Sequence, residues 1–138
     1  MRKTLDFVEA NFIKTHAYDP ASKSTTRIPT GQMVAATFQH DTSRNLEAHL
    51  HTHCVIANMT LNQDGQWRSI EPTALRRHVK LIGAYYHNEL ARWLMAEGYH
   101  LQPRMIGTTP GFKIAGYDKQ TLEQFSTGFC RGNQCGNR

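Results

Sequence analysis

Three histidines have the spacing of a metal site. Ten residues separate His40 from His51, and one residue separates His51 from His53. A set of three neutral imidazoles, without a carboxylate or thiolate, leaves coordination positions open on a divalent ion. Such an ion polarises a phosphoryl or carbonyl oxygen, or activates a water molecule. The spacing therefore predicts a metal site of the catalytic kind, with His40, His51 and His53 as its ligands.

Two predicted strands must position these histidines. Residues 33–40 and 50–60 are apolar, rich in β-branched residues and bounded by polar sequence. Residues two apart on a strand share a face, so His51 and His53 point the same way, about 7 Å apart. If the two strands pair antiparallel, His40 meets them at one end of an apolar face. The residues predicted to continue this face into a core are Val34, Ala36, Phe38, Val55, Ala57 and Met59.

Three residues near the histidines have alternative roles. By alternation, His49 lies on the same face as His51 and His53. It could replace His51 as a ligand or position a ligand, but we expect it to be simply exposed. Asp41 is placed to accept a hydrogen bond from a ligand imidazole. Arg44 either binds a phosphate oxygen bidentately or forms a surface ion pair with Asp41 or Glu47.

These motifs resemble a known family. HDTSR at 40–44, LHTH at 50–53 and DGQWRSIEP at 64–72 are similar to segments of the MobF-type conjugative relaxases, which belong to the HUH endonuclease superfamily. The resemblance also includes residues 30–39 and 75–99, and it extends from about residue 5 to residue 126. Carried over by position, His40, His51 and His53 match the three metal ligands of that family.

The resemblance implies a fold and an activity. Relaxases of this family nick one DNA strand at a plasmid transfer origin, with a bound divalent metal ion such as Mg, Mn or Zn and a nucleophilic tyrosine. Their partners are single-stranded DNA at the transfer origin and other relaxosome proteins. The implied fold is an antiparallel sheet, the HUH palm, with helices packed on it.

The resemblance also implies that the domain is truncated at its N-terminus. In that family the tyrosine and an acidic residue that orients a ligand histidine lie upstream of the region matched here. We therefore expect a partial relaxase domain that retains the metal ligands and cannot nick DNA alone. A second chain that supplies the N-terminal half is the expected partner for activity.

The chain as a whole reads as one α+β domain at residues 1–127, followed by a disordered Gly- and Asn-rich tail at residues 128–138. Periodicity predicts a helix at 4–14, a hairpin arm or edge strand at 18–27, a short strand at 66–70, a long helix at 73–97 capped by Gly98, and strands at 99–106 and 111–115. Trp67 is predicted to be core, and Tyr85 and Tyr86 to pack rather than to act as nucleophiles.

The charge and cysteine content limit the function classes. A net charge of +5 permits contacts with nucleic-acid phosphates, for which we propose Lys23 and Arg27 in the arm and Arg104 and Lys113 in the last hairpin. Three cysteines make no disulfide framework, and Cys130 and Cys135 are only half of a zinc site. No apolar run approaches the roughly 20 residues of a membrane span, so the cytoplasm is expected.

Two other function classes remain open. A cupin-like metal-dependent small-molecule enzyme also uses His-x-His on a strand, but the glutamate expected four or five residues later is replaced here by Ala57 and Asn58. A metal-independent module for single-stranded DNA is the second alternative. It predicts that replacing His51 and His53 by alanine leaves the DNA affinity unchanged.

Overall fold

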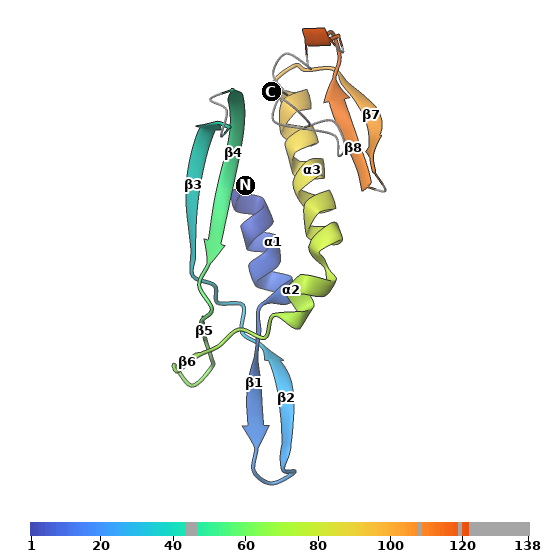
Figure 1. Ribbon diagram of the computed structural model, residues 1–138. Helices are drawn as coiled ribbons and strands as arrows, with labels where there is room; N and C mark the ends of the chain where they lie inside the picture. Colours follow the sequence, from blue (N-terminus) through green and yellow to red (C-terminus); the bar gives the residue numbers. More distant parts are fainter. Residues whose placement is uncertain (44–46, 108, 119, 122–138) are drawn as a thin grey trace, which may run out of the picture.

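The computed structural model describes residues 1–43, 47–107, 109–118 and 120–121 (Figure 1). The helices are α1 (Arg2–Phe12), α2 (Thr73–Arg77) and α3 (Val79–Ala96). The strands are β1 (Lys14–Asp19), β2 (Ser24–Pro29), β3 (Ala35–Thr42), β4 (Ala48–Ile56), β5 (Thr60–Leu61), β6 (Trp67–Arg68), β7 (Leu101–Ile106) and β8 (Thr109–Ile114). Figure 1 shows the β1–β2 hairpin projecting at one end, and the β3–β4 and β7–β8 hairpins on either side of the helices.

The strands pair only two by two. Each pairs antiparallel with its neighbour in sequence, β1 with β2, β3 with β4, β5 with β6 and β7 with β8, and no strand in the described part of the chain has a second partner. The predicted class, antiparallel strands with packed helices, is confirmed. The expected single sheet is instead four separate ribbons. Two-stranded ribbons are marginally stable by themselves, so their stability depends on what packs against them.

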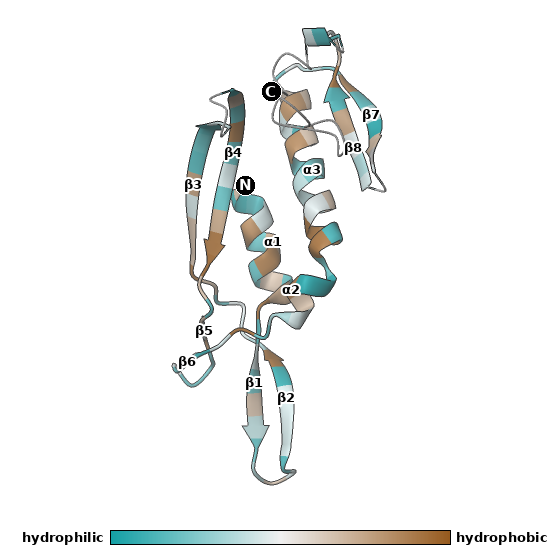
Figure 2. Cartoon of the chain, viewed as in Figure 1, coloured by the Kyte–Doolittle hydropathy of each residue, from teal (hydrophilic) through white to brown (hydrophobic). Residues whose placement is uncertain are grey.

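The buried core is small and lies where α1 meets the base of the first hairpin. Val8 and Phe12, four residues apart on α1, share one helix face and pack with Ile13 and Ile70. Ile13, between α1 and β1, is 1% exposed. Figure 2 shows hydrophobic residues gathered on the helices and the lower part of β4, whereas the β1–β2 hairpin is mostly hydrophilic. The packing prediction for the first helix is confirmed.

Buried threonines join the segments around this core. The Thr60 hydroxyl, fully buried, donates to the Gln32 carbonyl at 2.6 Å and lies 2.5 Å from the Thr30 hydroxyl. The Thr15 hydroxyl donates to the Ser69 carbonyl at 2.8 Å. Because a buried hydroxyl without a partner is costly, these bonds fix the base of the β1–β2 hairpin against β5 and β6.

Glu71 completes the junction. Its backbone N–H donates to the Lys14 carbonyl at 2.8 Å, and its carboxylate accepts from the Thr73 N–H at 2.9 Å at the start of α2. Arg27 of β2 lies 3.4 Å from the other carboxylate oxygen. Hydrogen bonding with Thr73 is the main cause that lowers the pKa of Glu71; burial opposes it, and the positive charge of Arg27 adds to it. One side chain thus ties the hairpin to the helical part.

The predicted helix over residues 73–97 is wrong in one respect. His78 leaves the helical conformation, at φ −108° and ψ 15°, and divides the segment into α2 and α3. Its ring stacks on Phe12 at 5.0 Å between centroids, and its Nδ1 lies 2.7 Å from the Ala74 carbonyl oxygen. These tertiary contacts offset the loss of helix continuity. Gly98 has φ +89°, the left-handed conformation of the predicted C-terminal cap.

Several apolar side chains that were predicted to be core are exposed. Trp67 is 56% exposed, Val55 is 57% exposed and Phe38 is 52% exposed. The physical reason is that a two-stranded ribbon has two faces, and within the described residues helices cover only one of them for β4. Among the described helices, none is long and apolar enough to cross a membrane.

Candidate functional site

The β3–β4 ribbon positions the three predicted ligands. Its register places His40 directly opposite His51 and Phe38 opposite His53. Residues directly opposite one another share a face, and His51 and His53 share a face by alternation. The three imidazoles therefore lie on one face of the ribbon, as predicted from spacing. A register shift between His40 and Thr42 marks a β-bulge at the end of the histidine cluster.

The three rings are in mutual contact. The centroid of the His40 ring lies 5.4 Å from that of His51 and 5.1 Å from that of His53. The His51 and His53 centroids are 4.9 Å apart, with their Nε2 atoms 3.2 Å apart. Two imidazole nitrogens that bind one zinc ion at about 2.1 Å lie roughly 3.4 Å apart. The His51 and His53 nitrogens are thus nearly as far apart as a ligand pair, and without a metal they form a hydrogen bond with each other.

A backbone carbonyl sets the proton position on His51. The Nδ1 atom of His51 lies 2.7 Å from the carbonyl oxygen of His49. A carbonyl only accepts, so Nδ1 carries the proton and donates it, and the lone pair of the neutral ring is on Nε2. Metal-binding histidines are commonly held in this way by a hydrogen bond at the other ring nitrogen. The contribution of His49 to His51 comes from its backbone, although its ring also lies 4.8 Å from that of His51.

The fit to a metal ion is partial. Within the described residues, no group of three or more histidine, cysteine, aspartate or glutamate side chains has its donor atoms arranged to hold an ion. The His51–His53 pair is suitably spaced, and the His40 ring is beside it. Convergence of all three donors on one point therefore requires a change in ring orientation. The ligand set His40, His51 and His53 stays a prediction.

The histidine face is open. His40 and His53 are exposed, and so are Phe38 and Val55 beside them. The predicted continuation of this face into a core is wrong, because the ribbon packs with its other face: Ile56, on that other face, contacts the core cluster around α1. A large substrate can therefore reach the imidazoles from solvent.

Of the two other residues predicted near the histidines, the structure describes Asp41 but not Arg44. Asp41 lies at the bulge and is exposed, and within the described part of the chain it makes no hydrogen bond to an imidazole. Its predicted role in orienting a ligand stays a prediction. Arg44 lies outside the described residues, as do Cys130, Cys135 and the tail at residues 128–138.

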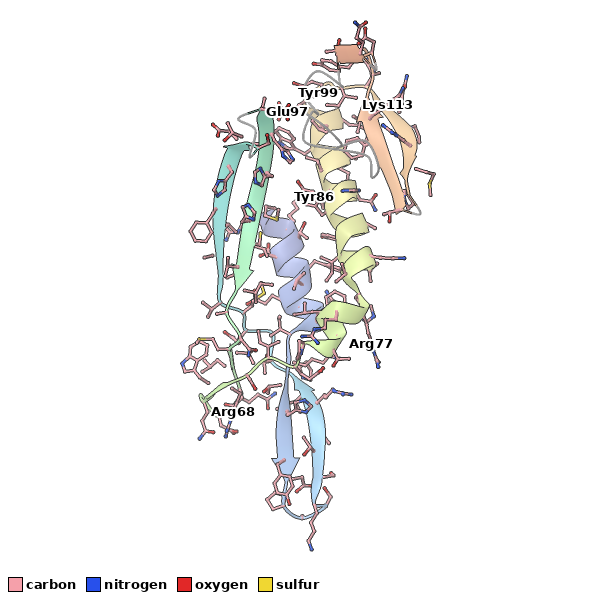
Figure 3. All side chains as sticks on the ribbon, in the orientation of Figure 1. Arg68, Arg77, Tyr86, Glu97, Tyr99 and Lys113 are labelled. Carbon is pink, nitrogen blue, oxygen red and sulfur yellow. The ribbon has the colours of Figure 1, made fainter. Side chains whose placement is uncertain are left out.

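The four remaining basic residues proposed for DNA contact lie on two hairpins. Lys23 is exposed in the turn between β1 and β2, whereas Arg27 is held by Glu71. Arg104 and Lys113 share the face of the β7–β8 ribbon opposite to Pro103 and Phe112, two residues that line a hollow against α3. Figure 3 shows Lys113 projecting outward at the end of the molecule far from the β1–β2 hairpin. The positive charges are thus distributed along the length of the protein.

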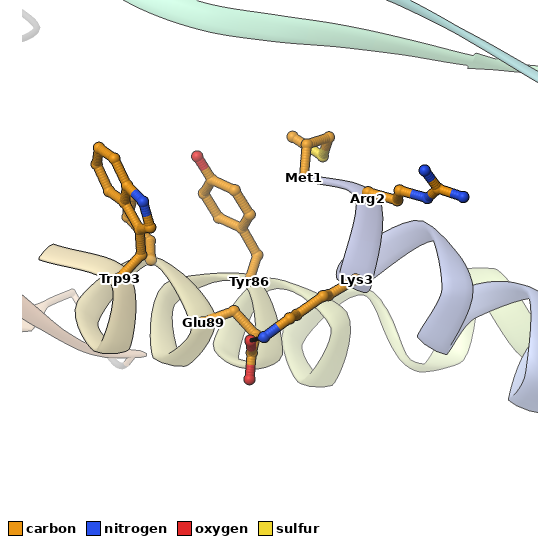
Figure 4. Close-up of a pocket in the computed structure, with 7 residues that line it drawn as sticks. Met1, Arg2, Lys3, Tyr86, Glu89 and Trp93 are labelled. Carbon is orange, nitrogen blue, oxygen red and sulfur yellow. Dashed lines mark ion pairs between the residues drawn. The ribbon is translucent and has the colours of Figure 1, made fainter. Parts of the chain in front are cut away.

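A hollow of about 380 Å³ lies between the start of α1 and α3. It is lined by Met1, Arg2, Lys3, Tyr86, Glu89, Leu90 and Trp93. Figure 4 shows Met1, Tyr86 and Trp93 projecting to the same side of the two helices. The apolar residues 86, 90 and 93 recur with helical period in the sequence, which predicted that they are buried against a sheet. In the structure they line the hollow instead, and Trp93 is 57% exposed. Sequence reasoning therefore missed this surface.

An ion pair at the hollow and a ring stack beside it hold α1 against α3. Lys3 lies 3.1 Å from Glu89, and its hydrogen bond is the main cause that lowers the pKa of that carboxylate, against the effect of burial. Phe7 stacks on Tyr85 with centroids 4.1 Å apart and planes 4° apart. Tyr85 is therefore a packing residue, as predicted, whereas Tyr86 faces the hollow.

Comparisons with known proteins agree on one family. The family model described as TrwC relaxase matches residues 1–129. Among curated proteins, the multifunctional conjugation protein TraI of Escherichia coli strain K12 is 40% identical over 62 residues, which are 45% of this chain and 3% of TraI. A second TraI of Escherichia coli is 35% identical over 82 residues, covering 53% of this chain and 5% of that protein. The chain thus spans a small part of these relatives.

Solved structures of TrwC are similar over most of the chain. TrwC complexed with a 27-mer DNA comprising the recognition hairpin and the cleavage site is 36% identical, with a TM-score of 0.82 over 90% of this chain and 42% of that one. A metal-bound complex of TrwC with oriT DNA has the same identity and TM-score, over 91% of this chain and 41% of the TrwC chain. A copper-bound complex of TrwC with oriT DNA has a TM-score of 0.81 over 90% of this chain and 40% of the TrwC chain. The motifs, the fold and these matches together show that the chain belongs to the TrwC relaxase family.

Proposed function

We propose that this chain is part of a conjugative relaxase domain that binds single-stranded DNA at a transfer origin and a divalent metal ion at His40, His51 and His53. The observation that carries the proposal is the contact of three imidazoles on one open face, with the Nε2 atoms of His51 and His53 3.2 Å apart. Family membership supports it. So do the TrwC complexes, which contain oriT DNA and, in two cases, a metal.

Each group of residues has a distinct task in this proposal. When bound, the metal ion polarises the scissile phosphate as a Lewis acid. His51 and His53 would hold it once the proton shared between their Nε2 atoms is released, and the His49 carbonyl keeps the lone pair of His51 on Nε2. The residues that hold the DNA backbone at some distance from the reacting phosphate are Lys23, Arg27, Arg104 and Lys113. Arg44 lies beside the site in sequence and binds a phosphate oxygen there.

Which metal ion is bound depends more on which divalent ions are available in the cell than on the three imidazole ligands. Three imidazoles accept Zn, Mn, Co or Ni, whereas Mg prefers oxygen ligands, so an Mg ion at this site would take most of its ligands from water and phosphate oxygens. We place the protein in the cytoplasm, where plasmid DNA is found, together with other relaxosome proteins as partners.

We further propose that the chain does not nick DNA by itself. The histidine ribbon carries no tyrosine, and all five tyrosines lie elsewhere: Tyr18, Tyr85, Tyr86, Tyr99 and Tyr117. Tyr85 is stacked on Phe7. We propose that none of these five tyrosines is the nucleophile, so that strand cleavage requires a tyrosine other than those in residues 1–138.

Calorimetric titration tests the proposed metal site. Zn²⁺ or Mn²⁺ is titrated into the wild-type protein and into a His51→Ala/His53→Ala variant, and both are checked for folding by circular dichroism. Binding in the wild type and its loss in the folded variant are expected. Absence of binding to a folded wild-type protein would contradict the site. Cleavage of a single-stranded oriT oligonucleotide by the purified chain alone would contradict the proposed inactivity.

One observation favours the alternative of a metal-independent DNA-binding module. The three donors do not converge as they stand within the described residues. The alternative predicts equal DNA affinity in the wild type and the His51→Ala/His53→Ala variant, with or without metal, and a salt dependence set by Lys and Arg contacts alone. A fluorescence-anisotropy titration with labelled single-stranded DNA at several salt concentrations distinguishes the two functions.

A further inference from the structure

The two partners of the ion pair between Arg27 and Glu71 differ in their exposure. The Arg27 side chain is 58% exposed and the Glu71 side chain is 5% exposed, so the carboxylate lies inside the junction and the guanidinium faces solvent. The contact joins Nε of Arg27 to one carboxylate oxygen at 3.4 Å. A good charge-assisted hydrogen bond is about 2.7–2.9 Å long. The arginine is therefore held loosely.

Glu71 is fixed by contacts that do not involve Arg27. Its other carboxylate oxygen accepts from the Thr73 N–H at 2.9 Å, and its backbone N–H donates to the Lys14 carbonyl at 2.8 Å. Hydrogen bonding with Thr73 is the main cause of the lowered pKa of Glu71, and the charge of Arg27 contributes less. The carboxylate therefore keeps its position and its negative charge when Arg27 leaves it.

Arg27 can leave Glu71 without loosening the hairpin. The base of the β1–β2 hairpin is held by the backbone bond between residues 71 and 14 and by the bond from the Thr15 hydroxyl to the Ser69 carbonyl. Neither bond involves the Arg27 side chain. A change in the side-chain torsions of Arg27 is thus sufficient to turn its guanidinium from Glu71 to a ligand outside the protein.

A phosphate is the ligand that suits this guanidinium. The planar fork of an arginine binds the oxygens of a phosphate in pairs, as it does those of a carboxylate. The hairpin projects from the rest of the molecule (Figure 1), with Lys23 exposed in its turn and His16 exposed directly opposite Arg27. Its one acidic residue, Asp19, accepts hydrogen bonds within the turn. An anion that approaches the hairpin therefore meets Arg27 with Glu71 as its main competitor.

We propose that Glu71 competes with DNA phosphate for Arg27, so that the buried carboxylate holds Arg27 in the free chain and the ion pair opens when the hairpin binds DNA. This inference rests on the proposed function and adds to it a residue that limits DNA affinity without touching DNA. Because Arg27 is already neutralised in the free chain, its contact with a phosphate releases fewer counterions than that of an unpaired lysine. Glu71 thus stabilises the junction and weakens DNA binding.

A double-mutant cycle between Glu71 and Arg27 tests the competition. The wild type, Glu71→Gln, Arg27→Ala and the double variant are titrated into a fluorescein-labelled oligothymidylate of about 20 nucleotides at several salt concentrations, and anisotropy gives the affinity. Glu71→Gln is expected to bind about twofold to fivefold more tightly than the wild type, with a slope of log K against log salt that is steeper by up to about 0.7. In the Arg27→Ala background, the same change is expected to alter the affinity by less than about 1.5-fold.

Two controls separate the competition from net charge and from loss of stability. Glu97→Gln makes the same change of charge at the end of α3 and is expected to leave the affinity within about 1.5-fold. Glu71→Asp keeps the charge but shortens the side chain, and it is expected to bind more tightly than the wild type and less tightly than Glu71→Gln. Circular dichroism checks that each variant is folded. A loosened junction by itself weakens binding, whereas the competition predicts tighter binding by less stable variants.

Three results would overturn the proposal. They are equal affinities and slopes for the wild type and Glu71→Gln, an equal gain from Glu71→Gln in the Arg27→Ala background, and weaker binding by both Glu71 variants. Each of them leaves DNA binding by the wild type in place, so it contradicts the competition alone. Absence of binding by the wild type and every variant would contradict the DNA-binding part of the proposed function as well, and metal titration reports on the histidine site separately.

Discussion

At the scale of single residues, the two histidines nearest the start of β4 contribute through different atoms. His49 offers its backbone carbonyl to His51, and a change of side chain leaves that carbonyl in place. In the proposed site, His51 would offer its ring nitrogen Nε2 to the metal. The two residues lie on the same face, so their substitution changes the local charge and polarity in the same way.

We therefore expect His49→Ala to keep the metal affinity within about threefold and His51→Ala to lower it by about a hundredfold or more. Calorimetry measures both. Nitrogen-15 spectra of the metal-free protein are expected to show His51 protonated at Nδ1 in the wild type and in His49→Ala. An equal loss of affinity in the two variants would mean that the His49 ring itself is a ligand.

Glu71 carries the second prediction at this scale. Its pKa in the folded protein is lowered from the ordinary value of 4.5, mainly by hydrogen bonding with Thr73. A lowered folded-state pKa stabilises the fold above the ordinary value, and this contribution is lost as the pH falls through the lowered value. Glu71→Gln keeps the size and one acceptor but removes the attraction to Arg27.

We expect Glu71→Gln to have a lower free energy of unfolding than the wild type at pH 7, and the difference to shrink below about pH 4. Urea unfolding at a series of pH values measures it. Glu97→Gln, a carboxylate at the end of α3, is the matched control with the same change of charge. A difference that persists unchanged at low pH would assign the effect to packing and not to ionisation.

At the scale of elements, the β1–β2 hairpin is an arm without a core of its own. Its side chains are largely exposed, and its base is fixed by Thr15, Thr30 and Glu71. Such an arm is stabilised at its base and presents its turn to a partner. Lys23 is exposed in the turn, at φ +49°, and we propose that it contacts a phosphate, whereas Arg27 is already paired with Glu71.

Lys23→Ala is accordingly expected to weaken single-stranded oriT DNA binding and to lower the slope of log K against log salt by about 0.7, whereas Arg27→Ala changes the slope less. Anisotropy titrations at several salt concentrations give both slopes. Lys80→Ala, a lysine on α3, serves as a control of equal charge change. Identical slopes for Lys23→Ala and wild type would remove the arm from the DNA interface.

At the scale of the whole molecule, stability depends on a very small core. Only Val8, Phe12, Ile13 and Ile70 are buried hydrophobic residues in the described part of the chain. Large apolar side chains on β4, β6 and α3 are about half exposed, so they bury much less apolar surface than core residues do. The β1–β2, β3–β4 and β5–β6 ribbons meet at the junction around Ile13, whereas the β7–β8 ribbon packs on α3.

We therefore expect Ile13→Ala to lower the free energy of unfolding by about 2–5 kcal/mol, enough to unfold most of the protein. Val79→Ala, at an apolar residue that is exposed on α3, is expected to change it by less than about 0.5 kcal/mol. Urea denaturation followed by circular dichroism measures both. A small effect at Ile13 would show that the ribbons are stabilised elsewhere.

Local patterns in the sequence determined the elements and much of the site. Alternation along a strand put His51 and His53 on one face, and a polar turn-prone connection brought His40 opposite to them. Periodicity identified α1, and Gly98 marked the end of α3. These features depend on near neighbours in the chain, where backbone sterics and side-chain period decide the outcome.

Only the tertiary structure determines which element packs against each face of a strand or helix. The strands became four separate ribbons, the long helix broke at His78 because its ring stacks on Phe12, and the apolar face beside the histidines stayed in solvent. The hollow at Tyr86 and Trp93 arises for the same reason. Burial depends on which distant elements pack together, and an apolar stripe has the same period whether a partner covers it or not.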